Sequence, residues 1–462
     1  MNSQSAAAAS IALNRFGLGA RALDVPPANG QAWLLDQFPR YQPQPTPWQS
    51  QPDSATLASR AAQGQRAVAE APEAERPALR QKRNAELRDA YVAAVNARVR
   101  SAVETPTPFV ERMVHFWANH FAVSVDKPGL LALAGSFEAE AIRPHVLGNF
   151  GDMLRASVRH PAMLVYLDQP RSIGPASDVA VRAARRNPEQ VRGLNENLAR
   201  EVLELHTLGV RSGYGQADVT EFARALTGWT IGGLAGPRAQ IEPGRFGFMP
   251  AMHEPGERVI VGRRYAQAGE AQALAVRDDL ARAPATARHV AFKLVRHLVA
   301  DMPPPSLVEQ VSKAFLRSGG ALSAVYRALI ESPLAWDAAP MKFRTPWEWS
   351  IASLRALGWQ GDVPPGFVGF VNQLGQQTWR PGSPAGFDDT AAAWLGPDAL
   401  VRRVEVAQRL AQRADKSIDA RQLAPALFPG ALTASTLQAV SRADTGPVGL
   451  ALLLVSPEFL RR

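Results

Sequence analysis

The sequence predicts a mainly α-helical protein: one large multi-helical domain with long irregular loops, one small β-hairpin near residues 245–265 and a projecting helical segment near the N-terminus. Three observations support this fold class. Most of the chain carries apolar residues at helical spacing. Proline and glycine are concentrated in a few segments. With 46% hydrophobic residues over 462 positions, the chain can bury a large core.

The N-terminal part is predicted to contain a short helix, a linker and two long helices. Residues 5–22 form the first helix, which ends in two glycines. The Pro/Gln-rich stretch 40–52 is a linker, because proline breaks a helix interior. Residues 54–103 are rich in Ala, Arg, Glu and Gln, which predicts a projecting pair of helices. The chain is therefore divided into an N-terminal helix with its linker, a projecting helical segment and a helical main body that carries the predicted site: residues 1–53, 54–104 and 105–462.

The main body alternates between helical stretches and two irregular segments. Helices are predicted within 106–229, 270–358 and 390–462. Residues 230–265 combine repeated glycine and proline with alternating aromatic and β-branched residues, which indicates loops and the one hairpin. The second irregular segment, 361–386, runs into the sequence WRPGSPAGFDD.

The chain contains no cysteine. This excludes a disulfide framework, a thiolate nucleophile, a zinc finger and an iron–sulfur cluster. Any metal must be held by imidazole, carboxylate, carbonyl or water. Side-chain chemistry is confined to histidine, carboxylate and hydroxyl groups.

The charge balance is basic, with a net charge of +9 and a pI near 10.2 that come mostly from arginine. Such a balance can indicate a nucleic acid or an anionic surface as the partner. The densest basic run, Arg182, Arg185 and Arg186, lacks interleaved aromatic residues and has no nucleic-acid motif beside it. We interpret it as a solvated loop, and nucleic acid is not the expected partner.

No stretch of eighteen uncharged apolar residues occurs, so no membrane span is expected. The N-terminus has no basic region before an apolar run, so no secretory signal is expected. The default expectation is a cytoplasmic location, with export alongside a partner left open.

Helical projection of residues 108–121 places one histidine on the apolar face. His120 lies in the middle of this face, so we expect it to be buried and to need a polar partner. His115 falls on the polar side with Glu111 and Arg112, where it needs no partner.

Residues 194–208 form a second candidate helix. Glu201 projects into its apolar stripe and should be neutralised by a partner, a proton or a metal. Asn195 and His206 lie together at one edge of the stripe. The other residues of this segment that we place in the candidate site are Arg200 and Glu204.

A histidine in a loop completes the set. His253 lies in the sequence MHEPGE, and loops held by a scaffold often carry ligating or catalytic side chains. We predict His120, His206 and His253 as ligands of a divalent metal. The predicted catalytic residues are Glu201, Glu204, Arg200 and Asn195, with either glutamate acting as general base or ligand. Metal-free acid–base chemistry and a buried hydrogen-bond network are the alternatives, since the spacing matches no short metal motif.

The usual cofactor and nucleophile motifs are missing. The chain has no complete dinucleotide fingerprint, no phosphate-binding loop and no GxSxG elbow. The WRPGSPAGFDD segment combines turn residues with Trp379, Arg380, Asp388 and Asp389 and could border a pocket. An ordered proline-rich loop without a role in a pocket is the favoured interpretation.

Several motifs, in order, resemble one family. ALNRFGLGAR, ERMVHFWANHFAVS, RHPAMLVYLD, NENLAREVLELHTLGVRSGYG and WRPGSPAGFDD are similar to segments of the bacterial domain-of-unknown-function 1800 (DUF1800) family. The resemblance spans about residues 10–460 and implies one mainly helical unit without an assigned activity. It also implies a protein partner from a sulfatase-like family encoded nearby. The residues that match the family's polar signature are Asn119, His120, Asn195, Glu196, Asn197, Arg200, Glu201, Glu204, His206, Asp218 and His253.

Three functions remain at this point. The first is a hydrolase-type, metal-dependent enzyme with its site between helices 108–121 and 194–208, closed by the 245–260 loop. The second is a non-catalytic helical scaffold or partner protein with a buried polar network. The third is a binder of an anionic polymer through the arginine-rich surface.

Overall fold

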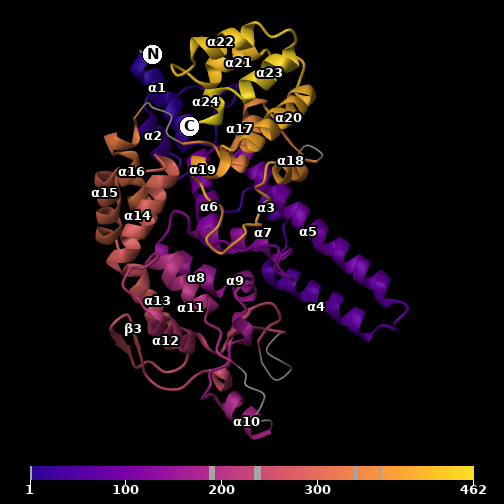
Figure 1. The fold of residues 1–462 in the computed structure, drawn as a ribbon, viewed down its shortest axis with the longest axis vertical. Coiled ribbons are helices and arrows are strands. Elements are labelled where there is room, and N and C mark those ends of the chain that lie inside the picture. Colours follow the sequence, from indigo (N-terminus) through magenta and orange to yellow (C-terminus); the bar gives the residue numbers. More distant parts are fainter. Residues whose placement is uncertain (1–2, 187–192, 234–240, 338–341, 362, 364–365) are drawn as a thin grey trace.

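The structure is a computed structural model that describes residues 3–186, 193–233, 241–337, 342–361, 363 and 366–462. Helices dominate it (Figure 1), and one continuous hydrophobic core includes side chains from Ile11 to Phe459. The predicted mainly α-helical, single-domain fold is confirmed. Parts of both predicted irregular segments, 234–240 together with 362 and 364–365, lie outside the described residues.

Two long helices project from the body near the N-terminus, as predicted. α4 (Ser54–Glu70) and α5 (Arg76–Glu104) lie side by side (Figure 1). The side chain of Asp53 caps α4 by accepting a hydrogen bond of 2.9 Å from the Thr56 N–H. One face of α5 is buried from Tyr91 to Val103, which anchors the pair in the core. The shorter N-terminal helices are α1 (Ser3–Ile11), α2 (Gly30–Leu35) and α3 (Thr46–Gln49).

The main body is built from short helices packed around one buried helix, α6 (Pro108–His120). α14, α15 and α16 pack on one another in chain order, and α20 to α23 form a cap near both termini (Figure 1). The helices between α6 and the strands are α7 (Leu133–Phe137), α8 (Phe150–Arg159), α9 (Pro161–Tyr166), α10 (Asp178–Arg186), α11 (Asn197–Glu201) and α12 (Gln216–Leu226). The helices after the strands are α13 (Glu270–Arg282), α14 (Pro284–Leu298), α15 (Pro305–Arg317), α16 (Leu322–Ile330), α17 (Pro346–Ala356), α18 (Phe367–Gln373), α19 (Ala391–Trp394), α20 (Pro397–Arg413), α21 (Ala420–Leu427), α22 (Ala434–Ser441), α23 (Gly446–Leu454) and α24 (Pro457–Leu460).

The irregular segment after α12 carries two antiparallel strand pairs in its described part, where one hairpin is predicted. β3 (Arg258–Ile260) and β4 (Arg263–Tyr265) form the expected hairpin. β1 (Trp229–Ile231) pairs with β2 (Phe246–Phe248), with Trp229 opposite Phe248. The β1–β2 pair joins strands that no short turn connects, which is why local turn signals do not indicate it.

In the part of the chain that the structure describes, three segments adopt the wider π-helical turn: η1 (Ala12–Phe16), η2 (Glu138–Ile142) and η5 (Val202–Thr207). The last continues α11, so the helix predicted at 194–208 begins at Asn197 and changes pitch after Glu201. A π turn holds more residues than an α turn, so the straight projection of this segment fails beyond Glu201. Such turns are frequent at functional sites.

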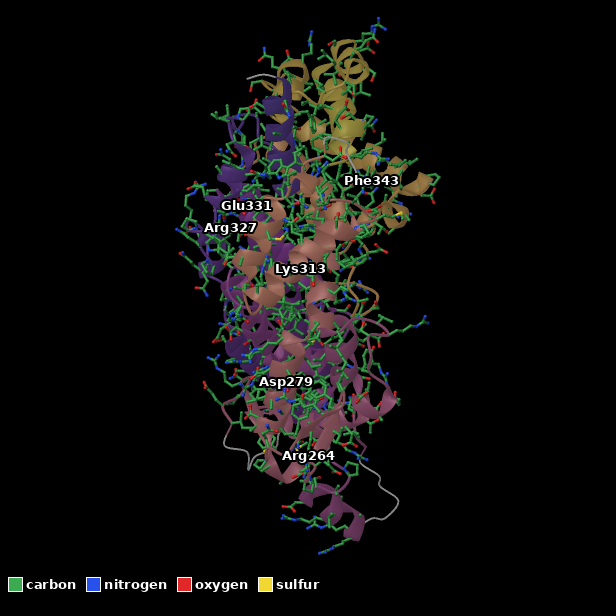
Figure 2. The ribbon with its side chains drawn as sticks, turned by 90° about the vertical axis from the view of Figure 1, so that its left-hand side faces the viewer. Arg264, Asp279, Lys313, Arg327, Glu331 and Phe343 are labelled. Carbon is green, nitrogen blue, oxygen red and sulfur yellow. The ribbon has the colours of Figure 1, made fainter. Side chains whose placement is uncertain are left out.

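The arginine-rich surface is extensively paired with carboxylates. On the face in Figure 2, Arg327 of α16 lies 3.2 Å from Glu331, the residue that follows this helix. Lys313 lies 3.3 Å from Glu309 within α15. Arg264 pairs with Glu257 beside β4. The basic run predicted as a solvated loop is instead the end of α10, and its arginines are exposed.

Among the described residues, no helix combines the length and the apolar character needed to cross a bilayer.

Candidate functional site

A pocket lies where α6 and α14 meet the segment 376–389, and we call it the α6–α14 pocket. It offers about 100 Å³ to water-sized molecules, room for a small chemical group. The WRPGSPAGFDD segment therefore does border a pocket, through Trp379, Asp388 and Asp389. The polar and charged residues of its lining are Arg98, Arg112, His115, Asn119, His120, Lys293, Arg296, His297, Thr345, Glu348, Gln376, Gln377, Thr378, Asp388 and Asp389.

A histidine and an aspartate form a hydrogen-bonded pair in this lining. His297, in the last turn of α14, has its Nδ1 atom 3.2 Å from Asp389 Oδ2. The carboxylate can only accept, so Nδ1 carries the proton and Nε2 has its lone pair free. Nε2 is buried and has no hydrogen-bond partner, and Glu348 Oε1 lies 4.0 Å away.

The surroundings keep the histidine neutral and the aspartate charged. Burial lowers the pKa of His297 to about 4, although the hydrogen bond to Asp389 opposes this. Burial alone would raise the pKa of Asp389, but His297, Lys342 and Arg296 hold it well below its usual range. Arg296 Nε lies 3.1 Å from Asp389 Oδ1.

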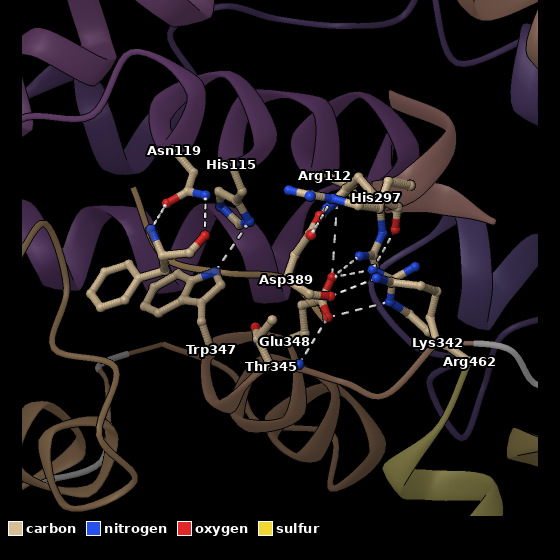
Figure 3. A network of polar contacts seen from close by, with 12 residues as sticks. Arg112, His115, Asn119, His297, Lys342, Thr345, Trp347, Glu348, Asp389 and Arg462 are labelled. Carbon is tan, nitrogen blue, oxygen red and sulfur yellow. Dashed lines mark hydrogen bonds and ion pairs between the residues drawn. The ribbon is translucent and has the colours of Figure 1, made fainter. Parts of the chain in front are cut away.

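Glu348 is the centre of a buried ionic network (Figure 3). Its carboxylate pairs with Arg112 of α6 and lies 2.7 Å from Arg462 at the end of the chain. It also accepts a hydrogen bond from the Thr345 N–H at 3.0 Å, which closes the capping box of α17. Burial alone would raise the pKa of Glu348, but Arg462 and Arg112 keep it well below its usual range.

Asn119 of α6 holds the segment 376–389, which covers one side of the pocket and which we call the covering segment. Its side-chain nitrogen donates to the Phe387 carbonyl at 2.8 Å, and its oxygen accepts from the Phe387 N–H at 2.8 Å. Gly386 is in the left-handed region with φ 83°, and a Cβ atom there would lie 2.3 Å from the Asn119 carbonyl oxygen. Only glycine fits this close approach.

Two further histidines lie close to His120, which lines the pocket. His120 is buried, as predicted, and its ring centre lies 6.3 Å from that of His206 and 6.1 Å from that of His289. His120 Nε2 lies 3.1 Å from the His206 carbonyl oxygen and therefore donates to it. Neither ring nitrogen of His206 has a hydrogen-bond partner. Burial keeps the pKa of His206 near 3 and that of His289 near 4, so both rings are neutral.

The polar side of α6 is not solvated, which corrects the expectation for His115. His115 is buried, and its Nδ1 accepts a hydrogen bond of 3.2 Å from Trp347 Nε1 (Figure 3). Glu111 is buried and makes two hydrogen bonds with Arg143, at 2.9 and 2.7 Å. Arg112 is buried too. Other helices cover the face that projection assigns to solvent.

The predicted catalytic residues of the 194–208 segment do not line the α6–α14 pocket. Glu201 is partly buried, and burial together with Glu204 raises its pKa to about 7. Arg200 lies 3.1 Å from Glu196 and also donates to Gln216.

The side chain of Asn195 makes hydrogen bonds with backbone groups only. Its side-chain nitrogen donates to the carbonyls of Leu167 and Asp168, each at 3.2 Å, and its oxygen accepts from the Asn197 N–H at 2.8 Å. It thereby fixes the start of α11.

His253 lies elsewhere, in a second pocket with Phe248 and Ser177. Its Nδ1 is 3.0 Å from the Thr227 carbonyl oxygen. The structure thus brings His120 and His206 together, but not with His253. Among the described residues, no three His, Cys, Asp or Glu side chains are grouped so that they could hold one metal ion.

Sequence reasoning assigned no role in the site to His297, Lys293 or Glu348. A signal for two of them was present, since His289, Lys293 and His297 recur every four residues and share one face of α14. Glu348 carried no such signal beyond its capping position.

Comparison with known proteins gives one match. The family model described as a protein of unknown function (DUF1800) matches residues 11–461. No curated protein and no solved structure matches the chain.

Proposed function

We propose that the chain, which belongs to the DUF1800 family of proteins of unknown function, is a hydrolase-type enzyme whose reaction takes place in the α6–α14 pocket. The His297–Asp389 pair carries the proposal, because it combines a neutral imidazole with a free, buried Nε2 in the lining of a concave pocket. The wall opposite α6 is α14, rather than the predicted 194–208 segment.

The pair has the features of a general base with its orienting group. Asp389 accepts a hydrogen bond from the Nδ1–H group, which fixes the tautomer and the ring orientation of His297. Nε2 then takes a proton from a water as the water oxygen forms a bond to the reacting atom of the substrate. The imidazolium returns this proton to the leaving group as the bond to that group breaks. Asp389 and the nearby Glu348 stabilise the imidazolium that forms.

The metal-dependent version of this function uses the neutral rings of His120 and His206. His120 donates through Nε2 to a backbone carbonyl, which leaves Nδ1 as a free electron pair, the usual arrangement of a ligating histidine. Elemental analysis of the untagged protein, together with its melting temperature in chelator, tests this version. The absence of stoichiometric metal and an unchanged melting temperature would contradict it.

The acid–base proposal is tested with chromogenic esters, amides and phosphoesters on the full chain. His297→Gln and Asp389→Asn should each lower kcat/KM by about 100-fold or more while the protein stays folded. Asp398→Asn, an exposed aspartate in the first turn of α20, is the matched control and should keep full activity.

The pH profile adds a readout that a structural role would not move. Because the base works unprotonated and the pKa of His297 is about 4, activity should be flat near neutrality and fall as the pH approaches 4. Asp389→Asn should move this midpoint to lower pH, since the carboxylate stabilises the imidazolium. Full activity of folded His297→Gln would overturn the proposal.

One observation favours a scaffold as the second candidate. The Glu348 network ties α6, α17 and the chain end together in the same lining. In this version the polar residues serve packing alone, and the protein supports a partner such as the sulfatase-like protein implied by the resemblance. Pocket variants that leave partner binding intact and alter only the melting temperature would support it.

A further inference from the structure

The lining of the α6–α14 pocket contains one lysine, Lys293. It lies on α14 one turn before His297 and one turn after His289, on the face that borders the pocket. Among the residues that the structure describes, none makes a hydrogen bond or an ion pair with its ammonium group. His289, one turn before Lys293 on the same face of α14, does have a hydrogen-bond partner, since its Nε2 lies 3.2 Å from the Leu205 carbonyl oxygen.

The other cations of the lining are already paired. Arg98 lies 2.8 Å from Glu138, which sits behind the lining. Arg112 pairs with Glu348, and Arg296 pairs with Asp389. The carboxylates of Glu348 and Asp389 are thus bound by arginines. The third carboxylate of the lining, Asp388, is exposed and accepts a hydrogen bond of 2.8 Å from the Thr390 N–H. None of these three described carboxylates makes an ion pair with Lys293.

The groups facing Lys293 do not compensate its charge either. His120, His206 and His289 lie close enough for the charge of Lys293 to lower their pKa values, and all three are neutral near pH 7. Burial, together with the neighbouring Arg296, lowers the pKa of Lys293 to about 8 against the opposing effect of Asp389. The lysine is therefore still mostly charged at neutral pH, at a partly buried place where an unpaired charge is costly.

We propose that Lys293 binds the anionic group of the pocket's ligand, a carboxylate or a phosphate. An anion here would form a charge-assisted hydrogen bond in a medium of low dielectric, where such bonds are strongest. The limited space, about 100 Å³, suits one such group of a small molecule.

The position of Lys293 also defines a substrate class for the proposed function. Successive turns of a helix are about 5.4 Å apart, so an anion on Lys293 lies about one turn from His297. The pocket would take a small anionic substrate whose reacting bond lies a few atoms from its charged group. This part rests on the proposed hydrolase function, whereas anion binding itself does not.

The first test measures anion binding without turnover. The full chain is titrated with inorganic phosphate and with acetate at constant ionic strength, and the melting temperature and the heat of binding are followed. Lys293→Met should bind the anion at least about tenfold more weakly than the wild type. Lys313→Met, an exposed lysine on α15 (Figure 2), is the matched control and should bind like the wild type.

The second test uses the wild type alone and stays informative if Lys293→Met fails to fold. An amine-reactive reagent at pH 8 should label Lys293, and mass spectrometry separates it from the other five lysines at positions 82, 127, 313, 342 and 416. Phosphate or acetate should protect Lys293 and not Lys313. Protection by phosphate alone indicates a phosphate-bearing ligand, and protection by acetate alone indicates a carboxylate.

Two results would overturn the proposal: equal anion affinity in Lys293→Met and the wild type, or labelling of Lys293 that neither anion slows. His297→Gln separates this proposal from the hydrolase function. It should lose activity and keep anion binding, so anion binding without any hydrolysis would contradict only the proposed reaction.

Discussion

His206 is buried completely, yet neither of its ring nitrogens has a hydrogen-bond partner. An unsatisfied buried polar atom costs about 1–3 kcal/mol, which a purely structural residue would not need to bear. The ring touches Phe121 and lies beside His120, so an apolar side chain would pack in its place. Because its two unpaired ring nitrogens lower the stability of the fold, we infer that His206 is present for its function rather than for packing.

Replacing His206 with leucine should raise the melting temperature, because leucine has no polar atom to satisfy. The gain should grow as the pH falls. The folded-state pKa of His206, about 3, lies below the ordinary 6.5, so between these values His206 causes a loss of stability that the variant lacks. The other buried histidines cause the same loss in both proteins. Thermal melts from pH 7.5 to 4.5 check this. A lower melting temperature of the variant at neutral pH would instead indicate a bound metal, as the metal-dependent version requires.

For Glu201 we expect the opposite dependence of protein stability on pH. Its pKa is raised from 4.5 to about 7, so the folded state holds the proton more tightly than the unfolded state. The associated stability is present below pH 4.5 and is lost as the pH rises through 7. Glu201→Gln should therefore melt progressively above the wild type between pH 5 and 8. Glu86→Gln, at an exposed position on α5, should follow the wild type, and parallel curves for Glu201→Gln would refute the burial effect.

At the scale of elements, the covering segment 376–389 is positioned by specific hydrogen bonds rather than by regular structure. The Asn119 side chain makes two hydrogen bonds with the Phe387 backbone, and the Val125 N–H donates to the Trp379 carbonyl at 2.9 Å. Tyr91 of α5 donates to the Thr378 carbonyl, also at 2.9 Å. The projecting helix and α6 thus hold the same segment, which forms one side of the pocket.

Gly386→Ala should detach this segment from α6, because the new Cβ atom would collide with the backbone and side chain of Asn119. We expect faster hydrogen exchange and proteolysis within 376–389 and a destabilisation of about 1 kcal/mol or more. Gly382→Ala is the control in the same segment, since a Cβ there meets no atom within 4 Å. Equal exchange rates in the two variants would argue against the close approach as the fastening point.

At the scale of the whole molecule, Glu348 joins segments that are far apart in the chain. Arg112, which it binds, also donates to the Gly17 carbonyl near the N-terminus, at 2.8 and 2.6 Å. Arg462 at the other end donates to the His297 carbonyl at 2.9 Å. A single buried carboxylate therefore connects both ends of the chain, α6 and α14.

Glu348→Gln should be strongly destabilising, by about 3–5 kcal/mol, because it leaves the buried Arg112 and Arg462 without a counter-charge. Denaturant unfolding with an unchanged m-value measures this directly. Glu331→Gln removes the exposed pair with Arg327 and should cost less than about 1 kcal/mol. Similar losses in the two variants would show that the buried network contributes no more than a surface ion pair.

The sequence by itself determined the features that depend on local periodicity and composition. These are the mainly helical fold, the projecting α4 and α5, the burial of His120 and the confinement of side-chain chemistry to groups other than thiols. Each follows from spacing along one helix or from the absence of a residue type, so no distant contact is needed to infer it.

Only the tertiary structure decided which polar residues form a site. The π turn after Glu201 redirected the 194–208 segment, and other helices buried the side of α6 that projection assigns to water. His297 and Asp389 are 92 positions apart, and Arg112 and Glu348 are 236 apart. Such pairs leave no periodic trace in a single sequence, because the packing of whole elements, rather than local spacing, brings their side chains within reach.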